Sequence, residues 1–495
     1  MIFNSLIFIA FITCFFAGWP LVKNRTVPRY LYVLSASLFF YGWWNWYYLF
    51  VLLISGMIDF AAALVIDRCK TKWHKKLWLT ISMVTNLGML GTFKYSAFIV
   101  ENLNALLHAI GFTGANLSVS LPEFFLVLPV GISFYTFQSM SYTIDVYRGQ
   151  CKPTTNLLHF FTYLTLFPQL VAGPIERATN LLPQVAQTPK PTTEEERWQA
   201  FCLIAWGYFK KMVVADNLAL FVDEAFAATQ ATPSCLWWWT MMIGFAFQIY
   251  CDFSGYTDIA RGLARWMGLH LMKNFRFPYF STDIREFWTR WHISLSSWFR
   301  DYVYIPLGGN RKGTMRTYLH LWITLGLSGL WHGSQWTFVA WGLVHAFFSS
   351  IERCFHFCTH LKQKGGFGRS VAWVLTSIQI IIAWVFFRAE NFSQACTILQ
   401  KMFSFSEPFP LCEMMRFGFI DLAIFFTAKR VYFTLVVCGG LWFLEACYLW
   451  MQQKQFHPIE RFHLSPRVQA IFMGIFLFVV IFFRGPGKTF IYFQF

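Results

Sequence analysis

Apolar runs of about 20 residues recur along this chain of 495 residues, and they constrain its fold more than any other feature. A helix of about 20 apolar residues spans the hydrocarbon core of a bilayer. Such runs occupy residues 2–22, 30–44, 46–66, 77–98, 124–142, 198–222, 236–256, 317–330, 336–352, 370–388, 431–450 and 466–484. A single helix forms all of its backbone hydrogen bonds within itself, which a separate segment inside a bilayer must do. We therefore expect an all-α, polytopic integral membrane protein with about 11–12 transmembrane helices.

The composition excludes an ordinary soluble domain. Hydrophobic residues make up 56% of the chain and charged residues 13%, whereas soluble domains carry about 25% charged residues. The net charge of +16 comes from basic residues in short breaks between apolar runs, such as 23–29 and 68–76. This placement follows the positive-inside rule and predicts that both breaks face the cytoplasm. It favours a membrane lipid environment and gives no indication of a nucleic-acid partner.

No soluble domain interrupts the apolar pattern, so we expect a single transmembrane domain over residues 1–495. We divide it into N-terminal helices (1–150), a catalytic core (151–350) and C-terminal helices (351–495). Segments 157–172 and 284–306 contain breakers or many charges. Irregular backbone at membrane depth is tolerated where it is buried in protein or lines a wet cavity. These segments therefore predict re-entrant or interfacial helices around a central funnel or tunnel.

His332 is the first candidate for chemistry, because it lies between Gly329 and Gly333 in the middle of an apolar stretch. Ionisable groups inside apolar segments are expensive and are functional candidates by default. A histidine can take or give a proton near neutral pH. The two glycines predict a helix break and a close approach of the substrate. The alternative is a packing histidine that bonds to a neighbouring carbonyl group.

A second candidate is His292, which follows a run of charges and aromatic residues. At helical spacing, Trp288, Trp291 and Leu295 share one face of a helix, while His292 lies on the opposite, polar face. The pattern predicts one amphipathic helix through 285–295. The alternative is an interfacial helix whose charges form salt bridges.

A third candidate is the stretch that contains Asp252, Ser254 and Asp258. We expect the two carboxylates to end or interrupt an apolar helix, and to orient a histidine or line a polar path. The alternative is an ordinary helix end capped by aspartate or serine. Lys210 and Lys211 lie within another apolar run, where they either snorkel to the interface or face a cavity.

We expect no metal site. Cys354 and Cys358, and likewise His356 and His360, are spaced at i,i+4, which suits zinc. The two pairs point to opposite sides of one helix, however, and cannot reach a single ion.

Several motifs along the chain resemble those of the membrane-bound O-acyltransferase family, and their order in the sequence is also that of the family. They are NFRFPY at 274–279, FWTRWHISLS at 287–296, WFRDY at 298–302, YIPLGGNR at 304–311, GLWHG at 329–333, CDFSGY at 251–256, VAGPI at 171–175 and the terminal run 490–495. They are most similar to the bacterial branch that O-acetylates alginate and peptidoglycan. The resemblance covers residues 30–495 and implies a fold of many helices around a thinned centre.

The resemblance implies an O-acetyltransferase of the bacterial inner membrane with His332 and His292 as its catalytic residues. Acetyl-CoA is the implied cytosolic donor, no bound cofactor is expected, and a polysaccharide is the acceptor. A periplasmic or membrane-anchored acetyltransferase of the SGNH type is the implied partner. We further assign weaker tunnel or donor-binding roles to Trp331, Trp336, Arg290, Trp291, Asp252, Ser254, Asp258 and Arg300.

Three other functions remain open at this point. A D-alanyl transferase acting on teichoic acid would share the two histidines and take its acyl group from a carrier protein. A proton-coupled transporter would also use histidine, aspartate and lysine at membrane depth. A scaffold without catalytic activity would tolerate replacement of His332.

Overall fold

A computed structural model describes residues 1, 3–112, 114, 117–118, 122–189, 192–229, 235–404, 422–453 and 465–491. Every regular element in these ranges is helical, so the predicted all-α class is confirmed. The helices follow the apolar runs closely, as Leu6–Val22 and Gly365–Arg388 do. Residues 492–495 of the predicted terminal motif lie outside the described ranges.

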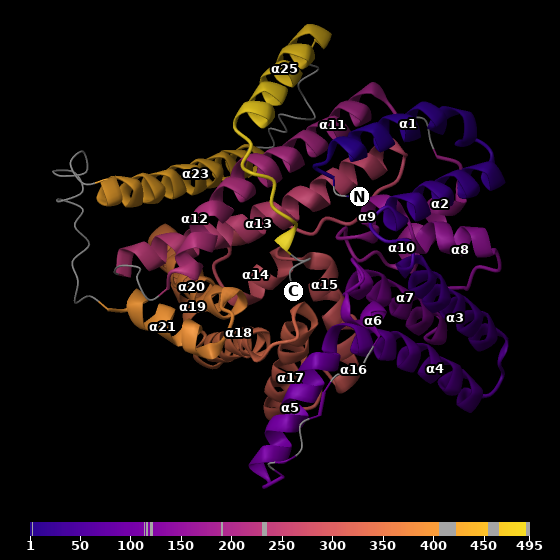
Figure 1. The fold of residues 1–495 in the computed structure, drawn as a ribbon, viewed down its shortest axis with the longest axis horizontal. Helices are drawn as coiled ribbons and strands as arrows, with labels where there is room; N and C mark the ends of the chain where they lie inside the picture. Colours follow the sequence, from indigo (N-terminus) through magenta and orange to yellow (C-terminus); the bar gives the residue numbers. More distant parts are fainter. Residues whose placement is uncertain are drawn as a thin grey trace. The chain divides into compact units, whose positions relative to one another are not determined.

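The chain divides into two compact units, and unit 1 comprises residues 1–204 and 259–273. Its helices are α1 (Leu6–Val22), α2 (Thr26–Gly42), α3 (Tyr48–Arg68), α4 (Lys72–Leu90), the π-helix η1 (Gly91–Tyr95), α5 (Ser96–Ala109), α6 (Glu123–Leu126), α7 (Ile132–Tyr147), α8 (Leu157–Leu164), α9 (Phe167–Leu170) and α10 (Ala178–Ala186) (Figure 1). Helices α3, α4 and α7 pack against one another in its core. The predicted broken segment 157–172 forms the short helices α8 and α9.

A buried carboxylate joins these three helices. Asp59 of α3 is fully buried and accepts hydrogen bonds from Ser82 Oγ at 2.5 Å, from Asn86 Nδ2 at 2.8 Å and 2.9 Å, and from the hydroxyl of Ser139. Ser82 and Asn86 lie on α4 and Ser139 on α7. A buried polar group is stable only when hydrogen-bonded, so Asp59 fixes the packing of α3, α4 and α7.

Unit 2 comprises residues 205–258 and 274–495. Its described elements are the π-helix η2 (Phe209–Ala215), α12 (Asp216–Ala227), the 3₁₀-helix η3 (Pro278–Phe280), α14 (Ile284–Arg290), α15 (Ile293–Phe299), the π-helix η4 (Arg300–Tyr304), α16 (Ile305–Leu307), α17 (Thr314–His332), α18 (Trp336–Phe355), α19 (Phe357–Gln363), α20 (Gly365–Arg388), α21 (Phe392–Met402), α23 (Leu422–Gln453) and α25 (Pro466–Phe482). Two helices, α11 (Glu194–Tyr208) and α13 (Cys235–Trp266), have residues in both units.

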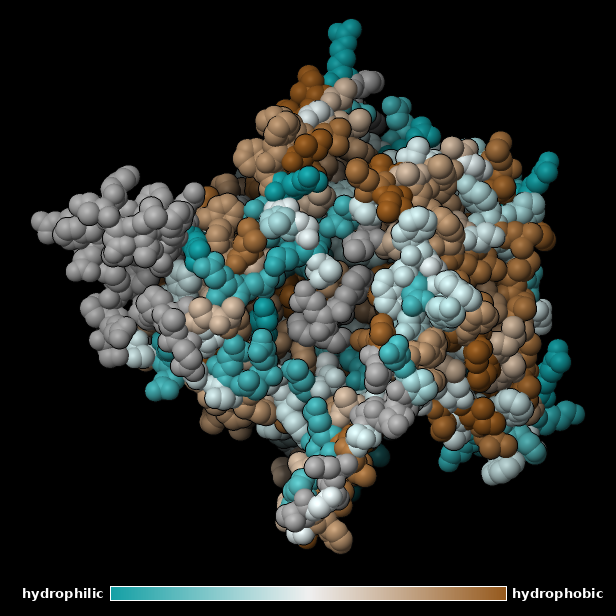
Figure 2. Space-filling view, viewed as in Figure 1, coloured by the Kyte–Doolittle hydropathy of each residue, from teal (hydrophilic) through white to brown (hydrophobic). Residues whose placement is uncertain are grey.

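The apolar helices give the chain its membrane character. Within the described residues, Tyr48–Arg68, Gly365–Arg388 and Tyr432–Met451 are long and apolar enough to cross a membrane, and Leu6–Val22 and Arg467–Phe482 are shorter apolar helices. Large apolar side chains are exposed on many helices, including Leu6, Val84, Leu87 and Phe472. Figure 2 shows apolar side chains spread over the face in view. Such a surface suits lipid rather than water.

Candidate active site

His332 is the last residue of α17, at the joint between two tightly packed helices. Gly333 adopts an extended conformation with φ −158° and ψ 156°, and α18 begins at Trp336. The predicted helix break at this position is therefore confirmed. At Gly329 the protein itself approaches closely, because a Cβ atom there would lie 2.2 Å from the carbonyl oxygen of Phe338. The glycine thus allows α18 to pack against the end of α17.

Aromatic side chains surround the His332 imidazole. Its ring centroid lies 5.0 Å from that of Trp331, 4.9 Å from that of Trp341 and 5.3 Å from that of Phe387. The residue is 3% exposed. Electrostatic interactions are stronger in such a buried, aromatic environment than in water.

His292 lies at a break between two short helices rather than within one helix. Helix α14 ends at Arg290, Trp291 is extended, and His292 has the left-handed conformation with φ 40° and ψ 54° before α15 begins. The predicted single amphipathic helix through 285–295 is therefore wrong. A residue other than glycine in this region of φ is uncommon, and such strain clusters at functional sites.

Backbone contacts from one neighbouring segment hold the strained joint. The amide of Ile293 donates to the carbonyl oxygen of Asn274 at 2.9 Å, and the amide of Ser294 donates to the Asn274 side chain at 3.2 Å. The amide of Arg276 donates to the carbonyl oxygen of Arg290 at 2.9 Å. Residues 274–276 thus fix both sides of His292, which explains why the NFRFPY run accompanies the histidine.

The two candidate histidines come together. Their ring centroids are 6.4 Å apart, and the His292 ring also lies 5.9 Å from Trp331 and 4.6 Å from Phe253. His292 is fully buried. Four elements therefore meet at the pair: α13, the α14–α15 joint, α17 and α18. The arrangement places two imidazole rings close enough for both to contact one bound substrate. Side chains positioned in this way are suited to acid–base chemistry.

Trp291, which is predicted from the sequence to line the tunnel or bind the donor, has a fully buried indole ring. It lies 5.0 Å from the ring of Phe275 and 5.0 Å from that of Trp384. Trp336 is 53% exposed at the start of α18.

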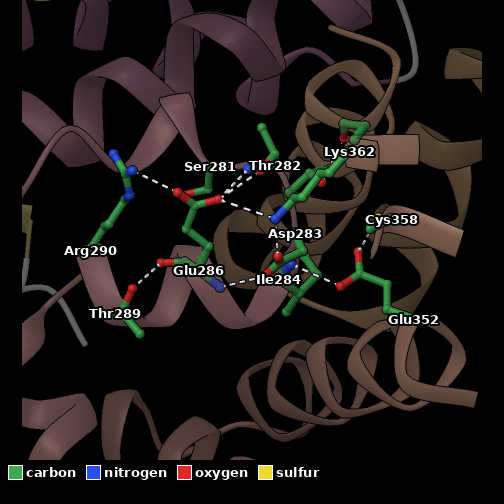
Figure 3. A network of polar contacts seen from close by, with 12 residues as sticks. Ser281, Thr282, Asp283, Ile284, Glu286, Thr289, Arg290, Glu352, Cys358 and Lys362 are labelled. Atoms are coloured by element: carbon green, nitrogen blue, oxygen red, sulfur yellow. Dashed lines mark hydrogen bonds and ion pairs between the residues drawn. The ribbon is translucent and has the colours of Figure 1, made fainter. Parts of the chain in front are cut away.

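The other end of α14 is fixed by a polar network (Figure 3). Asp283 caps α14 by accepting the amide hydrogen of Glu286 at 2.6 Å, and it is paired with Lys362. Glu352 accepts the amide hydrogen of Ile284 at 2.9 Å. Helices α18 and α19 thus hold the start of α14, which positions the strained histidine at its end.

Arg290 belongs to this network rather than to the histidine pair. Its guanidinium lies 2.6 Å from the carboxylate of Glu286, one turn earlier. Burial raises the pKa of Glu286, but the hydrogen bonds from Thr282 and the charges of Arg290 and Lys362 outweigh it and hold the pKa below its ordinary value. Arg300 is exposed and pairs with Asp301 at 2.8 Å.

Asp252, Ser254 and Asp258 do not interrupt a helix, which corrects the prediction. Helix α13 runs without a break from Cys235 to Trp266. Asp252 lies 2.6 Å from Lys211 Nζ, and Asp258 lies 2.6 Å from Lys210 Nζ. The carboxylates remain inside a helix because lysines of η2 neutralise them.

Both lysines point into the protein and do not snorkel. Lys210 is 3% exposed and Lys211 is 6% exposed. Lys211 Nζ also pairs with Asp216 at 2.8 Å and donates to the carbonyl oxygen of Lys488 at 3.1 Å. The amide of Ile491 donates to Asp252 at 2.6 Å. This ion cluster, formed by Lys211, Asp216, Asp252 and the segment 488–491, fixes the end of the chain on η2 and α13.

A second residue in the left-handed conformation, His356, ends α18 and separates the two cysteines that were considered as zinc ligands. His356 has φ 52° and divides α18 from α19, so Cys354 and Cys358 lie on different helices, contrary to the single helix assumed from their spacing. Cys358 donates to Glu352 at 3.6 Å. Within the described residues, no three side chains of histidine, cysteine, aspartate or glutamate gather as a metal site.

Sequence reasoning missed Trp341, Trp384, Phe387 and His345, which pack around the histidine pair and behind it. Trp341 and His345 are one turn apart on α18, within the same apolar run as Trp336. Their periodicity is that of any buried helix face. Only the neighbouring helices reveal that this face meets the site.

Comparison with known proteins agrees with this geometry. The sequence model of the membrane-bound O-acyltransferase family matches residues 152–392, which include both histidines. The probable alginate O-acetylase of Pseudomonas putida is 38% identical over 442 residues, covering 89% of this chain and 87% of the relative.

Two further relatives lie in the same group. The peptidoglycan O-acetyltransferase of Helicobacter pylori is 34% identical over 434 residues, covering 81% of this chain and 80% of the relative. The teichoic acid D-alanyltransferase of Bacillus subtilis is 28% identical over 279 residues, covering 54% of this chain and 68% of the relative. The paired histidines, the order of motifs and this extent of identity establish that the chain is an acyltransferase and belongs to the membrane-bound O-acyltransferase family.

Proposed function

We propose that this enzyme is embedded in the bacterial inner membrane and crosses it several times. It moves acetyl groups from cytosolic acetyl-CoA across that membrane for O-acetylation of an exported or cell-wall polysaccharide. The observation that carries the proposal is the 6.4 Å approach of the His292 and His332 rings in a buried aromatic site. An acyl transfer from a thioester needs a base for the acceptor and a site from which water is excluded. The histidine pair and its aromatic surroundings supply both.

His332 is the general base in this proposal. It removes the proton from the acceptor hydroxyl group as that oxygen attacks the thioester carbonyl carbon, and it later returns the proton to the leaving thiolate. A positioned base contributes about 10²–10⁴-fold to the rate. His292 orients the acceptor, because the strained backbone conformation fixes its ring toward His332.

The donor is expected to approach from the cytoplasmic side. Arg300 and Arg311 are exposed and carry charges that suit the phosphate groups of coenzyme A. The acetyl group is expected to be taken by a periplasmic or membrane-anchored acetyltransferase of the SGNH type, which would place it on the glycan.

The names of the relatives support acetyl as the transferred group. A probable alginate O-acetylase and a peptidoglycan O-acetyltransferase match more than four fifths of this chain, while the D-alanyltransferase matches 54% of it. D-alanyl transfer from a carrier protein is the second candidate. A transporter is disfavoured because the matching family and the relatives are acyltransferases. A scaffold is disfavoured because it leaves the histidine pair without a role.

The first test compares base-labile esters on envelope and secreted glycans of the wild type with those of His332→Ala at equal membrane levels. Loss of acetate supports the acetyl proposal and identifies the glycan that serves as acceptor. Loss of D-alanine instead assigns the enzyme to the carrier-protein reaction. Unchanged esters with a folded variant would overturn the assignment of His332 as the base.

A further inference from the structure

The end of the chain reaches the histidine pair through two phenylalanine rings. Phe490 lies on the segment that follows α25, and its ring centroid is 5.6 Å from that of Phe253 on α13. Phe253 in turn meets the His292 imidazole in an edge-to-face arrangement, with 4.6 Å between the centroids and an interplanar angle of 80°. Phe490 is 1% exposed and Phe253 is 0% exposed. Phe253 therefore contacts both the terminal segment and the strained histidine.

Polar contacts fix the terminal segment on both sides of Phe490. Two residues before it, Lys488 Nζ pairs with the carboxylate of Asp223 at 3.0 Å. One residue after it, the amide of Ile491 donates to Asp252 at 2.6 Å. These contacts lead to α12 and to α13, so the segment is held on two helices at once.

Stability alone does not account for the ion cluster that holds this segment. The desolvation of a buried ion pair offsets most of its attraction, so apolar side chains would hold the segment equally well. Directed polar contacts add a fixed register, because each carboxylate accepts from one particular group. The ion cluster therefore determines that Phe490, and not a neighbouring residue, contacts Phe253.

His292 needs a neighbour of this kind because its hydrogen-bonded backbone does not fix its ring. The contacts with Asn274 hold the main chain on the C-terminal side of His292, but an imidazole still rotates about its side-chain bonds. The Phe253 ring lies 4.6 Å from that of His292, closer than the ring of Trp331 at 5.9 Å. Without firm packing at Phe253, the imidazole gains other orientations beside His332.

We propose that Phe253 and Phe490 are positioning residues of the acyl transfer. Phe490 holds the ring of Phe253 in place, and Phe253 holds the His292 imidazole in its orientation beside His332. The inference rests on the proposed function, because it concerns the rate of the reaction in which His292 takes part. Displacing a catalytic group by about 1 Å through a distant substitution lowers a rate by about 10²-fold. The effect is therefore expected in kcat and not in the affinity for the donor.

The test measures the thiol released from acetyl-CoA by native membranes that contain the full-length enzyme, with His332→Ala membranes as the background. Phe490→Leu keeps the position apolar and removes the ring that contacts Phe253. We expect kcat to fall by about 10- to 10²-fold, while KM for acetyl-CoA stays close to that of the wild type. A purely structural role would lower the amount of folded enzyme and leave kcat of the folded enzyme unchanged.

A double-mutant cycle tests whether Phe490 acts through Phe253. Residues that act through one contact give non-additive losses, whereas independent sites add. We expect Phe253→Leu to lower kcat at least as much as Phe490→Leu does, and the double variant to be no slower than Phe253→Leu alone. Two losses that multiply in the double variant would contradict the proposed order of contacts.

Phe160→Leu is the matched control, because it also removes a buried aromatic ring. Phe160 lies on α8 in unit 1 and is 0% exposed, with its ring 5.1 Å from that of Tyr142 and 5.4 Å from that of Phe161. We expect this replacement to lower the unfolding midpoint as Phe490→Leu does, but to leave kcat of the folded enzyme unchanged.

Three further results would overturn the inference: wild-type kcat in folded Phe490→Leu, an equal loss of kcat in Phe160→Leu, or a rise in KM for acetyl-CoA that accounts for the whole loss. If wild-type membranes release no more thiol than the His332→Ala background, the acetyl proposal fails instead. The same variants then test the positioning role with D-alanine on its carrier protein as donor, read in the same way from kcat and KM.

Discussion

Lys211 and Asp252 form a buried ion pair, with Nζ 2.6 Å from Oδ1 and side-chain exposures of 8% and 4%. Lys211 lies on the π-helix η2 and Asp252 in the middle of α13. A buried pair gains little over apolar packing, but loss of one partner leaves a buried charge and costs about 3–5 kcal/mol.

The two partners are not equivalent, and this gives the first prediction. Lys211→Met leaves the carboxylates of Asp252 and Asp216 without their shared cation, whereas Asp252→Asn leaves Lys211 paired with Asp216 at 2.8 Å. We therefore expect Lys211→Met to lower the free energy of unfolding by about 3–5 kcal/mol and Asp252→Asn to lower it by less. Thermal unfolding in one detergent measures both, and the reverse order would contradict the pairing.

The packing of α17 on α18 gives the second prediction. In Gly329→Ala the new Cβ would lie 2.2 Å from the Phe338 carbonyl oxygen, so the two helices must separate at His332. We expect a loss of about 1–3 kcal/mol in stability together with a loss of transfer activity.

Gly326→Ala is the control on the same helix, because its Cβ would make ordinary contact with Leu343 at 3.4 Å. Since alanine favours a helix over glycine by about 1 kcal/mol, this variant should be as stable as the wild type or slightly more so. Equal effects of both variants on unfolding and activity would show that the helix joint does not depend on Gly329.

The backbone at His292 gives the third prediction. Both His292→Gly and His292→Ala remove the imidazole, and we expect both to lose transfer activity to the same extent. They differ in backbone strain, because only glycine adopts the φ of 40° without penalty. His292→Gly should therefore be more stable than His292→Ala by about 1 kcal/mol. Equal unfolding midpoints would indicate that the left-handed conformation is not retained in the variants.

The carboxylate of Glu286 gives a prediction about pH. Its pKa is lower in the folded protein than its ordinary value of 4.5. The stabilising contribution is therefore complete above that ordinary value and is lost as the pH falls through the folded pKa. We expect the difference in unfolding midpoint between the wild type and Glu286→Gln to be constant near neutral pH and to shrink in acid.

Glu101→Gln serves as the control for this experiment, since Glu101 is an exposed glutamate of α5. Because its side chain is exposed, this replacement should leave the unfolding midpoint close to that of the wild type. A difference for Glu286→Gln that persists in strong acid would mean that packing, rather than the charge of Glu286, holds the start of α14.

The apolar periodicity of the sequence predicted most helices and the break at His332, because both depend on local residue types. Runs of about 20 apolar residues have few alternatives to a helix. Gly333 beside His332 likewise indicated the end of α17 through its own backbone freedom. The proximity of His292 and His332 was available only through the family resemblance, since no local pattern relates residues on different helices.

The errors have a common physical cause. Helix α13 continues through Asp252 and Asp258 because lysines of η2, distant in sequence, neutralise them. The break at His292 has neither glycine nor proline, and contacts with Asn274 impose it. In both places tertiary contacts override local preference, so the pattern of nearby residues contains no sign of the outcome.

The ion cluster also has a consequence for how the protein is made. Lys211 donates to the carbonyl oxygen of a residue 277 positions later, and Asp252 accepts from one 239 positions later. Chains are synthesised from the N-terminus, at about 5–20 residues per second. η2 and α13 are therefore synthesised well before residues 488–491 exist, so Lys211 and Asp252 lack these two hydrogen bonds during that interval. The charge cluster is thus completed only after the chain has been made as far as residue 491.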